Sequence, residues 1–318
     1  MLNVNRLRVL REIASRGTIA AAAEALYMTP SAISQQMATL EREAGTPLLE
    51  RAGRGVRLTP AGERLVTHAE RVIAVLEEAQ ADVDAVARGV AGRLRTCAFP
   101  TGARALLIPA LSRIRAEYPR LQLSMVDLEP EESVPLLKTG EIDVLLTYEF
   151  DHLPQRDDPG VEQVLLAIEP MAIALPVTHP AATGPVRVRD LKDEEWIVGQ
   201  DGSSLLEVQV RVANEAGFQP KLDLHSNDYQ VILAAVEAGL GVALVPPMAR
   251  FAEYPGVAFR RPEDMEVRRR ILAVIRRGSG KSPGIAALVE ALRDIARQQA
   301  AAHAHEGMVA PGPEGALR

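Results

Sequence analysis

Cysteine, aromatic side chains and long hydrophobic runs are all scarce in this chain of 318 residues. Cys97 is the only cysteine, so a disulfide within the chain is impossible and a cysteine-based metal cluster is not expected. No stretch approaches the roughly 20 apolar residues that a membrane span requires. Arg6, Arg8 and Arg11 interrupt the apolar run that a signal peptide would need. We therefore expect a cytoplasmic protein without membrane contact, metal or cofactor.

A surface that is positively charged throughout is also not expected, because the net charge is −6. The charge is nevertheless uneven along the chain. Residues 1–62 contain eight arginines and five glutamates, so the acidic excess lies entirely in the remainder. A basic N-terminal segment joined to an acidic body is the asymmetry expected of a DNA-binding module attached to another domain. The length predicts two or three domains.

The first 58 residues predict three helices followed by a hairpin. The apolar periodicity and the turn residues place the helices at Val4–Arg16, Ile19–Leu26 and Pro30–Ala44. Thr18 and Thr29 are suited to N-cap positions, and Pro30 fits the first helical turn, where its missing N–H costs nothing. Leu48–Leu58 contains two short strand-like runs around a glycine-rich tip, which indicates a hairpin.

The second and third helices are joined by a tight turn, and small polar residues open the third. A helix fits the major groove of B-DNA, and side chains at its N-terminus reach base edges there. Arginines in the hairpin would contact neighbouring phosphates or a minor groove. The alternative is a generic helical hairpin with a solvated polar face. The candidate DNA-contacting residues are Thr29, Pro30, Ser31, Ala32, Ser34, Gln35, Gln36, Arg51, Arg54 and Arg57.

A long helix is expected over Pro60–Arg88. Its apolar residues follow a heptad spacing, which is typical of a helix that pairs with another. A narrow apolar stripe on so long a helix is difficult to bury within one chain, so we expect self-association. The candidate dimerisation residues are Leu65, Ala69, Val72, Leu76, Ala79 and Val83, and the pattern continues to Val86.

Gly89–Gly92 predicts a hinge, after which strands and helices alternate. This alternation indicates an α/β region with mainly parallel sheets, and its length suggests two lobes. The tail, residues 301–318, has a composition typical of disorder. Strands are expected at Leu94–Phe99, Leu121–Asp127, Ile142–Thr147, Val161–Ile168, Met171–Val177, Trp196–Gly199, Lys221–His225, Val242–Val245 and Arg270–Ile275. Helices are expected at Ala103–Glu117, Ser133–Thr139, Leu205–Ala216, Tyr229–Ala238 and Pro283–Gln299.

A ligand site is expected where strand ends meet helix N-termini in the α/β region. Each polar residue there could equally be only a helix cap, and Arg104 could be only a surface residue. The carboxylates around Asp127–Asp151 would select a cation or, alternatively, simply face water. The candidate effector-binding residues are Thr101, Gly102, Arg104, Glu129, Thr147, Asp201, Ser203 and Asn227.

Catalytic motifs that would indicate an enzyme are not recognisable, since the chain has no glycine-rich phosphate loop, G-x-S-x-G or H-E-x-x-H. We expect Cys97 to be a buried strand residue and not a redox sensor. The DNA-binding module, the heptad helix and the two-lobed region in one chain favour a transcriptional regulator that senses a small molecule. The alternative is a small-molecule-binding protein or an enzyme on the same scaffold.

The order of these elements resembles the LysR-type transcriptional regulators, over about residues 2–300. The matching motifs are Ala22-Ala23-Glu24-Ala25-Leu26, Pro30-Ser31-Ala32-Ile33-Ser34, Leu40-Glu41, Leu48-Leu49-Glu50-Arg51 and Leu58-Thr59-Pro60-Ala61-Gly62. Weaker matches follow at Ile108-Pro109, Tyr118-Pro119, residues 136–143 and residues 235–242.

The resemblance implies a winged helix-turn-helix domain at residues 1–59, a dimerising linker helix at 60–88, a hinge at 89–92 and an effector-binding domain at 93–300. That domain would be two-lobed, like type-2 periplasmic binding proteins, with lobe 1 at about 93–164 and 270–300 and lobe 2 at about 165–269. The implied function is sequence-specific transcriptional regulation controlled by a small molecule between the lobes. The implied partners are double-stranded DNA with a dyad-symmetric site, a small effector of unknown identity and a second copy of the chain.

Overall fold

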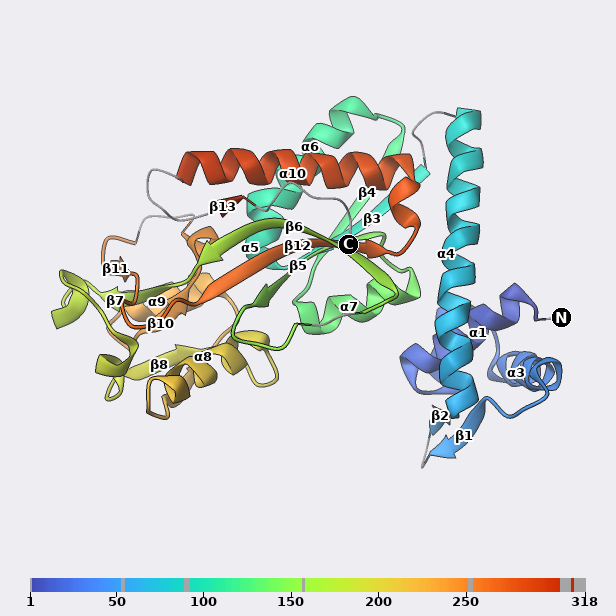
Figure 1. Ribbon diagram of the computed structural model, residues 1–318, viewed down its shortest axis with the longest axis horizontal. Coiled ribbons are helices and arrows are strands. Elements are labelled where there is room, and N and C mark those ends of the chain that lie inside the picture. The colour runs from blue at the N-terminus through green and yellow to red at the C-terminus, as the bar shows by residue number, and fades with distance from the viewer. Residues whose placement is uncertain are drawn as a thin grey trace.

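The computed structural model describes residues 2–52, 55–88, 92–155, 158–250, 254–303 and 310–311. It consists of a small helical module at the N-terminus, a long helix and an α/β body (Figure 1). The long helix α4 stands beside the body, and the N-terminal module lies at one end of it. Among the described helices, none combines the length and the apolarity of a membrane span.

The N-terminal module forms because its helix boundaries are set locally. The Thr18 and Thr29 hydroxyls accept hydrogen bonds from the N–H groups of Ala21 and Ala32, as expected of N-caps. Gly17 and Gly45 end α1 and α3 in left-handed conformations. The elements are α1 (Val4–Arg16), α2 (Ile19–Ala25), α3 (Pro30–Ala44), β1 (Leu49–Ala52), β2 (Gly55–Leu58) and α4 (Pro60–Arg88).

The hairpin β1–β2 is fixed to the start of α4. Thr59 Oγ1 donates to the Pro47 carbonyl at 2.8 Å and accepts from the Gly62 N–H at 3.1 Å. A Cβ atom at Gly62 would lie 2.2 Å from the Leu48 carbonyl oxygen, so only glycine permits this approach. The hairpin and α4 therefore belong to one packed unit.

The heptad residues of α4 divide into two groups. Ala69 is fully buried in the core of the N-terminal module, and Leu65 packs against that core. Ala69 is therefore enclosed within one chain, whereas Leu65 remains partly exposed, and the predicted contact of both with a second chain stays a prediction. Val72 and Leu76 are about two-fifths exposed (42% and 43%), and Ala79 is exposed as well. The side chains of Val83 and Val86 lie outside the described residues.

Lobe 1 of the body is built on a six-stranded sheet in the order β13-β6-β12-β5-β3-β4. Helix α10 packs against α6 and β6, and α7 packs against β5 and β12. Its strands are β3 (Gly92–Ala98), β4 (Leu121–Asp127), β5 (Val144–Phe150), β6 (Val161–Pro170), β12 (Arg268–Arg276) and β13 (Ala310–Pro311). Its helices are α5 (Pro100–Gly102), a π-helical stretch (Ala103–Leu107), α6 (Ile108–Glu117), α7 (Pro130–Thr139) and α10 (Pro283–His303).

Lobe 2 contains a three-stranded sheet, β10-β7-β11, and a pair, β8-β9. Its strands are β7 (Ala172–Pro176), β8 (Glu195–Val198), β9 (Lys221–His225), β10 (Ala243–Val245) and β11 (Val257–Arg260). Its helices are α8 (Ser204–Glu215) and α9 (Tyr229–Glu237), with 3₁₀ turns at Pro180–Ala182, Val188–Leu191 and Pro247–Ala249; a further 3₁₀ turn, Ser279–Lys281, precedes α10.

The expectation of mainly parallel sheets is wrong. Strand β12 is antiparallel to both β5 and β6, and β7 is antiparallel to β10 and β11. The reason is that β6 and β12 carry the chain out of lobe 1 and back again, so they run side by side in opposite directions. At the crossing, the Met171 N–H donates to the Val267 carbonyl at 2.7 Å.

Two further expectations need correction. Strands β11 and β13 were not anticipated, and α10 continues to His303, inside the tail that we expected to be disordered. Residues 304–309 and 312–318 of that tail lie outside the described residues. The composition of residues 301–318 therefore did not reveal where the last helix ends.

The N-terminal module contacts lobe 1 through α1 and the C-terminal end of α7. Arg11, which is 9% exposed, donates from Nη2 to the Thr139 carbonyl at 2.7 Å. Arg16 pairs with Glu141 just beyond α7, and with Glu12 on its own helix. Three charged residues of α1 thus serve this contact.

Candidate DNA-binding surface and interlobe cavity

Helix α3 has one buried face and one exposed face. Ile33, Met37 and Leu40 are at most 3% exposed and pack in the core of the N-terminal module. The opposite face presents most of the polar residues predicted to contact DNA. Thr29, Pro30, Ser31, Ser34 and Gln35 are exposed there, and Ala32 and Gln36 are partly exposed. The sequence prediction of an accessible polar helix face is confirmed, while the contact that each residue makes stays a prediction.

Hydrogen bonds within α3 distinguish among these residues. The Ser34 hydroxyl donates to the Pro30 carbonyl at 2.9 Å, which leaves it only as an acceptor toward outside groups. Ser31 and Thr29 pair with each other at 3.0 Å. Within the described part of the chain, no hydrogen bond occupies the side-chain amide of Gln35. Gln35 therefore offers both a donor and an acceptor to a base edge.

The arginines of the N-terminal module have different roles. Arg51 is exposed, whereas Arg57 is paired with Glu50 at 2.5 Å. Arg6 is paired with Glu43, and Arg11 and Arg16 face lobe 1. Arg54 lies outside the described residues. Fewer arginines of the N-terminal module are thus available to bind phosphates than the number in the sequence suggests.

Tyr27 was not among the DNA-contacting residues predicted from the sequence. It lies in the turn between α2 and α3, has a left-handed backbone (φ 52°) and is 98% exposed. A fully exposed aromatic ring beside the polar face of α3 is available to a bound partner. The only sequence signal was its place in the short turn.

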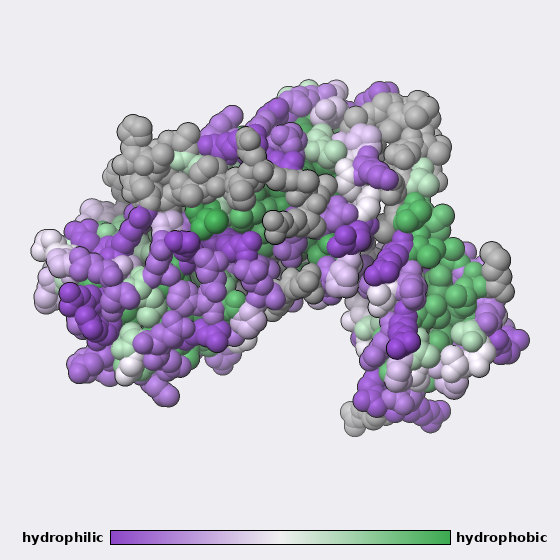
Figure 2. All heavy atoms as spheres, in the orientation of Figure 1, coloured by the Kyte–Doolittle hydropathy of each residue, from purple (hydrophilic) through white to green (hydrophobic). Residues whose placement is uncertain are grey.

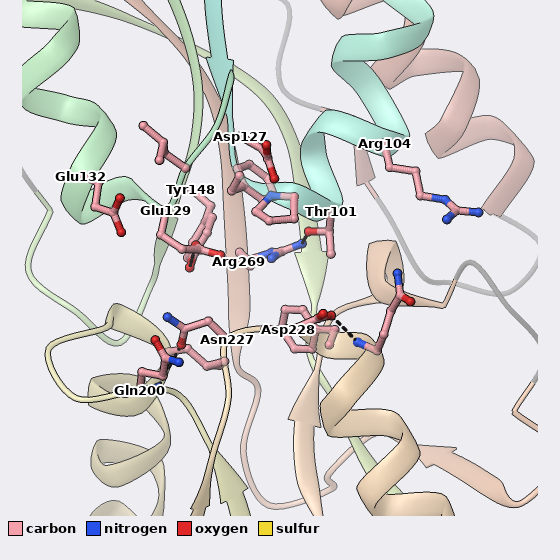
Figure 3. A pocket seen from close by; sticks show the side chains of 16 residues that line it. Thr101, Arg104, Asp127, Glu129, Glu132, Tyr148, Gln200, Asn227, Asp228 and Arg269 are labelled. Carbon is pink, nitrogen blue, oxygen red and sulfur yellow. Dashed lines mark hydrogen bonds between the residues drawn. The ribbon is translucent and has the colours of Figure 1, made fainter. Parts of the chain in front are cut away.

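A cavity of about 540 Å³ lies between the two lobes (Figure 3). The end of β3 and the start of α7 form one wall, the start of α9 forms the opposite wall, and Arg269 of β12 lies between them. The lining side chains are Phe99, Pro100, Thr101, Arg104, Asp127, Leu128, Glu129, Glu132, Tyr148, Gln200, Leu205, Asn227, Asp228, Tyr229, Gln230 and Arg269.

Four of the eight candidate effector-binding residues line this interlobe cavity, namely Thr101, Arg104, Glu129 and Asn227. The other four do not. Gly102 is buried against the Phe99 ring, where a Cβ atom would lie 2.4 Å from the ring, so it serves packing. Ser203 caps α8 by accepting from the Leu206 N–H at 3.2 Å. Thr147 lines a second cavity, of about 430 Å³, and Asp201 is exposed in a turn.

A buried ion pair adjoins the interlobe cavity, and its arginine belongs to the lining. Arg269 and Glu169 are direct partners across β12 and β6, and their side chains are 1% and 0% exposed. Arg269 Nε donates to Glu169 Oε1 at 2.7 Å, and Nη2 donates to Thr101 Oγ1 at 3.3 Å. Burial alone would lower the pKa of Arg269, but the Glu169 carboxylate raises it, so the guanidinium stays charged. Sequence reasoning missed this pair because it forms across 100 residues.

Aromatic rings surround the Arg269 guanidinium. Its central carbon lies 5.1 Å from the Phe99 ring centre and 5.0 Å from that of Tyr148. The Tyr148 hydroxyl donates to Glu129 Oε2 at 2.9 Å. Burial raises the pKa of Glu129, while the hydrogen bond from Tyr148 opposes this shift. The carboxyl of Glu129 is thus held in a poorly hydrated position.

Cys97 lies in β3 and is fully buried. Burial raises the pKa of its thiol to about 11, so the reactive thiolate is disfavoured at neutral pH. These observations support the structural role expected for this cysteine.

Comparison with known proteins gives concordant results. The family model described as the LysR substrate binding domain matches residues 87–297, and that of the bacterial regulatory helix-turn-helix protein, lysR family, matches residues 4–63. The transcriptional dual regulator GltC of Bacillus subtilis (strain 168) is 27% identical over 79% of this chain and 83% of its own length.

Two solved structures are similar over nearly the whole chain. The OxyR C206 mutant of Corynebacterium glutamicum has a TM-score of 0.59 at 27% identity, covering 96% of this chain and 95% of its own. Full-length CbnR complexed with its target DNA has a TM-score of 0.52 at 28% identity, covering 93% and 100%.

The Arg269→Met variant tests the buried ion pair. Removing the cation that faces Glu169 should lower the free energy of unfolding by about 3–5 kcal/mol, because a carboxylate then remains in a dry site. The double variant with Glu169→Met should recover most of that loss. Urea denaturation followed by circular dichroism measures both effects. A loss below about 1 kcal/mol in the single variant would contradict a structural role for the pair.

Proposed function

Because this chain belongs to the LysR family of bacterial helix-turn-helix transcriptional regulators, we propose that it recognises DNA through α3 and adjusts that recognition when a small molecule fills the interlobe cavity. The observation that carries the proposal is the exposed polar face of α3, in a module attached to a two-lobed body with a cavity. We propose that the protein acts in the cytoplasm, where the DNA that it binds would lie. No catalytic role is proposed, in keeping with relatives named as regulators.

For the DNA contact, we assign base recognition chiefly to Gln35, with Ser31, Ser34 and Gln36 beside it. Gln can bond an adenine edge with both atoms of its amide, whereas Ser34 has already used its donor. Arg51 supplies a phosphate contact, and Arg54 and Arg57 belong to the same hairpin. The partial positive charge at the start of α3 adds to the attraction for phosphate.

We keep the domain boundaries predicted from the sequence, with one adjustment at the lobes. The N-terminal module is taken to end at residue 59, with α4 as the linker. Of the hinge predicted at residues 89–92, residues 89–91 lie outside the described residues and Gly92 begins β3. The crossings between lobes are better set at Pro170–Met171 and Val267–Arg268, since β6 and β12 belong to the lobe 1 sheet along their whole length.

Helix α7 offers a physical connection between the two sites. Glu129 at its N-terminal boundary and Glu132 in its first turn line the interlobe cavity, whereas the carbonyl of Thr139 at its other end accepts from Arg11 of α1. A ligand that shifts α7 would therefore alter the contact between lobe 1 and the N-terminal module. This arrangement supports control of DNA binding from the cavity.

Self-association is proposed to use the exposed apolar residues of α4. Val72, Val75 and Leu76 are 42–61% exposed and form an apolar patch on α4 (Figure 2). Pairing of α4 with its copy would cover them and present two α3 helices to a two-fold symmetric DNA site.

The division between base and phosphate contacts predicts different behaviour of two variants. Gln35→Ala should reduce discrimination between the preferred site and its mismatched forms by about 1–3 kcal/mol, because a bidentate base contact is lost. Arg51→Ala should weaken binding to every sequence alike and reduce the salt slope by about one. Fluorescence anisotropy across a salt series measures both quantities. Arg115→Ala, at an exposed position of α6, is the matched control. Identical profiles for the Gln35 and Arg51 variants would refute the division.

The Leu76→Glu variant tests the proposed role of α4 in self-association. A buried carboxylate at a helix pair would be unpaired, so the variant should dissociate to a lower mass. Light scattering of the full chain gives the mass, and Thr67→Glu, on the other side of α4, controls for added charge. An unchanged mass for Leu76→Glu would show that α4 pairs elsewhere or not at all.

A further inference from the structure

The charges around the interlobe cavity are unbalanced. Four carboxylates line it, from Asp127, Glu129, Glu132 and Asp228. Of the two lining arginines, Arg269 is committed to Glu169, which balances its charge. Among the lining residues, four carboxylates thus stand beside two arginines, one of which is neutralised by a carboxylate outside the lining.

The arrangement of these groups separates Arg104 from the acidic side. Glu129 and Glu132 extend toward the cavity from the start of α7, opposite Asn227 and Gln200 (Figure 3). Arg104 lies at the other end of the view, with its guanidinium directed away from these carboxylates. An anionic ligand at the α7 side would meet carboxylates at short range, and the cation that acts on Glu129 there, Arg269, is already paired with Glu169.

A second, independent observation indicates that this region receives a ligand. Tyr229 lines the cavity and is 8% exposed, yet no hydrogen bond engages its hydroxyl within the described residues. The hydroxyl oxygen itself is not fully enclosed, so it opens toward the cavity that the ring lines, where a ligand can bond it. Burial raises the pKa of Tyr229 by more than the nearby Arg269 lowers it, so the phenol stays neutral and can accept as well as donate.

The carboxyl group of Glu129 could also bond a ligand in the cavity. Its carboxyl accepts from Tyr148 at 2.9 Å, and the nearest cation in the cavity, Arg269, already faces Glu169. A protonated amine has three donors in a compact charge and would satisfy carboxylate and phenol oxygens together.

We propose that the interlobe cavity binds a small organic cation, a molecule whose protonated amine lies among Glu129, Glu132 and the Tyr229 hydroxyl. The volume of about 540 Å³ suits a diamine or a basic amino acid. The proposal rests on the proposed function of the cavity as the effector site and specifies the chemistry of its ligand.

The test compares matched ligands of opposite charge on the full chain. Binding of 1,4-diaminobutane, L-lysine and L-arginine is measured by isothermal titration calorimetry, beside butanedioate and magnesium chloride. At least one amine should bind, and butanedioate should not. Glu132→Gln should weaken binding of the amine about tenfold, since one charge contact is lost at an exposed position. Glu117→Gln, on α6 outside the cavity, should leave the affinity unchanged.

Several outcomes overturn the proposal. These are binding of butanedioate in preference to the amines, binding of magnesium alone, no binding of any amine at millimolar concentration, or equal amine affinity in Glu132→Gln. Sequence-specific DNA binding by the ligand-free chain is measured separately. If it persists while the amines fail, only the ligand class is wrong, whereas its absence would defeat the proposed function itself.

Discussion

The packing of α3 against its own module is the constraint on which the remaining structure depends. Ile33, Met37 and Leu40 hold one face in the core, and Glu41 accepts the N–H groups of Leu48 and Leu49 at 2.9 and 3.2 Å. These contacts leave the polar face directed outward and fix the hairpin beside it. A helix with the same polar residues but a different apolar register would bury Gln35 and lose its access to DNA.

A second constraint operates in the body, where the two lobes meet. The Arg269–Glu169 pair lies at the crossing of β6 and β12, and the cavity is arranged around it. Because the pair is neutral as a unit, the cavity keeps the acidic character of its α7 and α9 walls. Helix α7 then extends from this acidic wall to α1 of the N-terminal module. In the proposed function, these contacts would connect the cavity to the position of the N-terminal module.

The sequence predicted those features of the fold that local interactions determine. Thr18, Thr29 and Pro30 marked helix starts correctly, because caps and the first turn depend on neighbouring residues alone. It did not predict that β12 pairs antiparallel with β6, nor that Arg269 meets Glu169, because both depend on distant segments. Gly102 and Ser203, predicted to contact a ligand, do not line the interlobe cavity. The sequence could not separate these roles, because packing against Phe99 and capping of α8 use the same residue types.

Selection of binding sites from a pool of random double-stranded DNA tests the central claim most directly. The full chain, at physiological salt, should enrich a two-fold symmetric sequence, and Gln35→Ala should enrich it less sharply while keeping its overall attraction for DNA. A recovered pool without symmetry or sequence preference would contradict the account, because an exposed α3 would then attract DNA without recognising it.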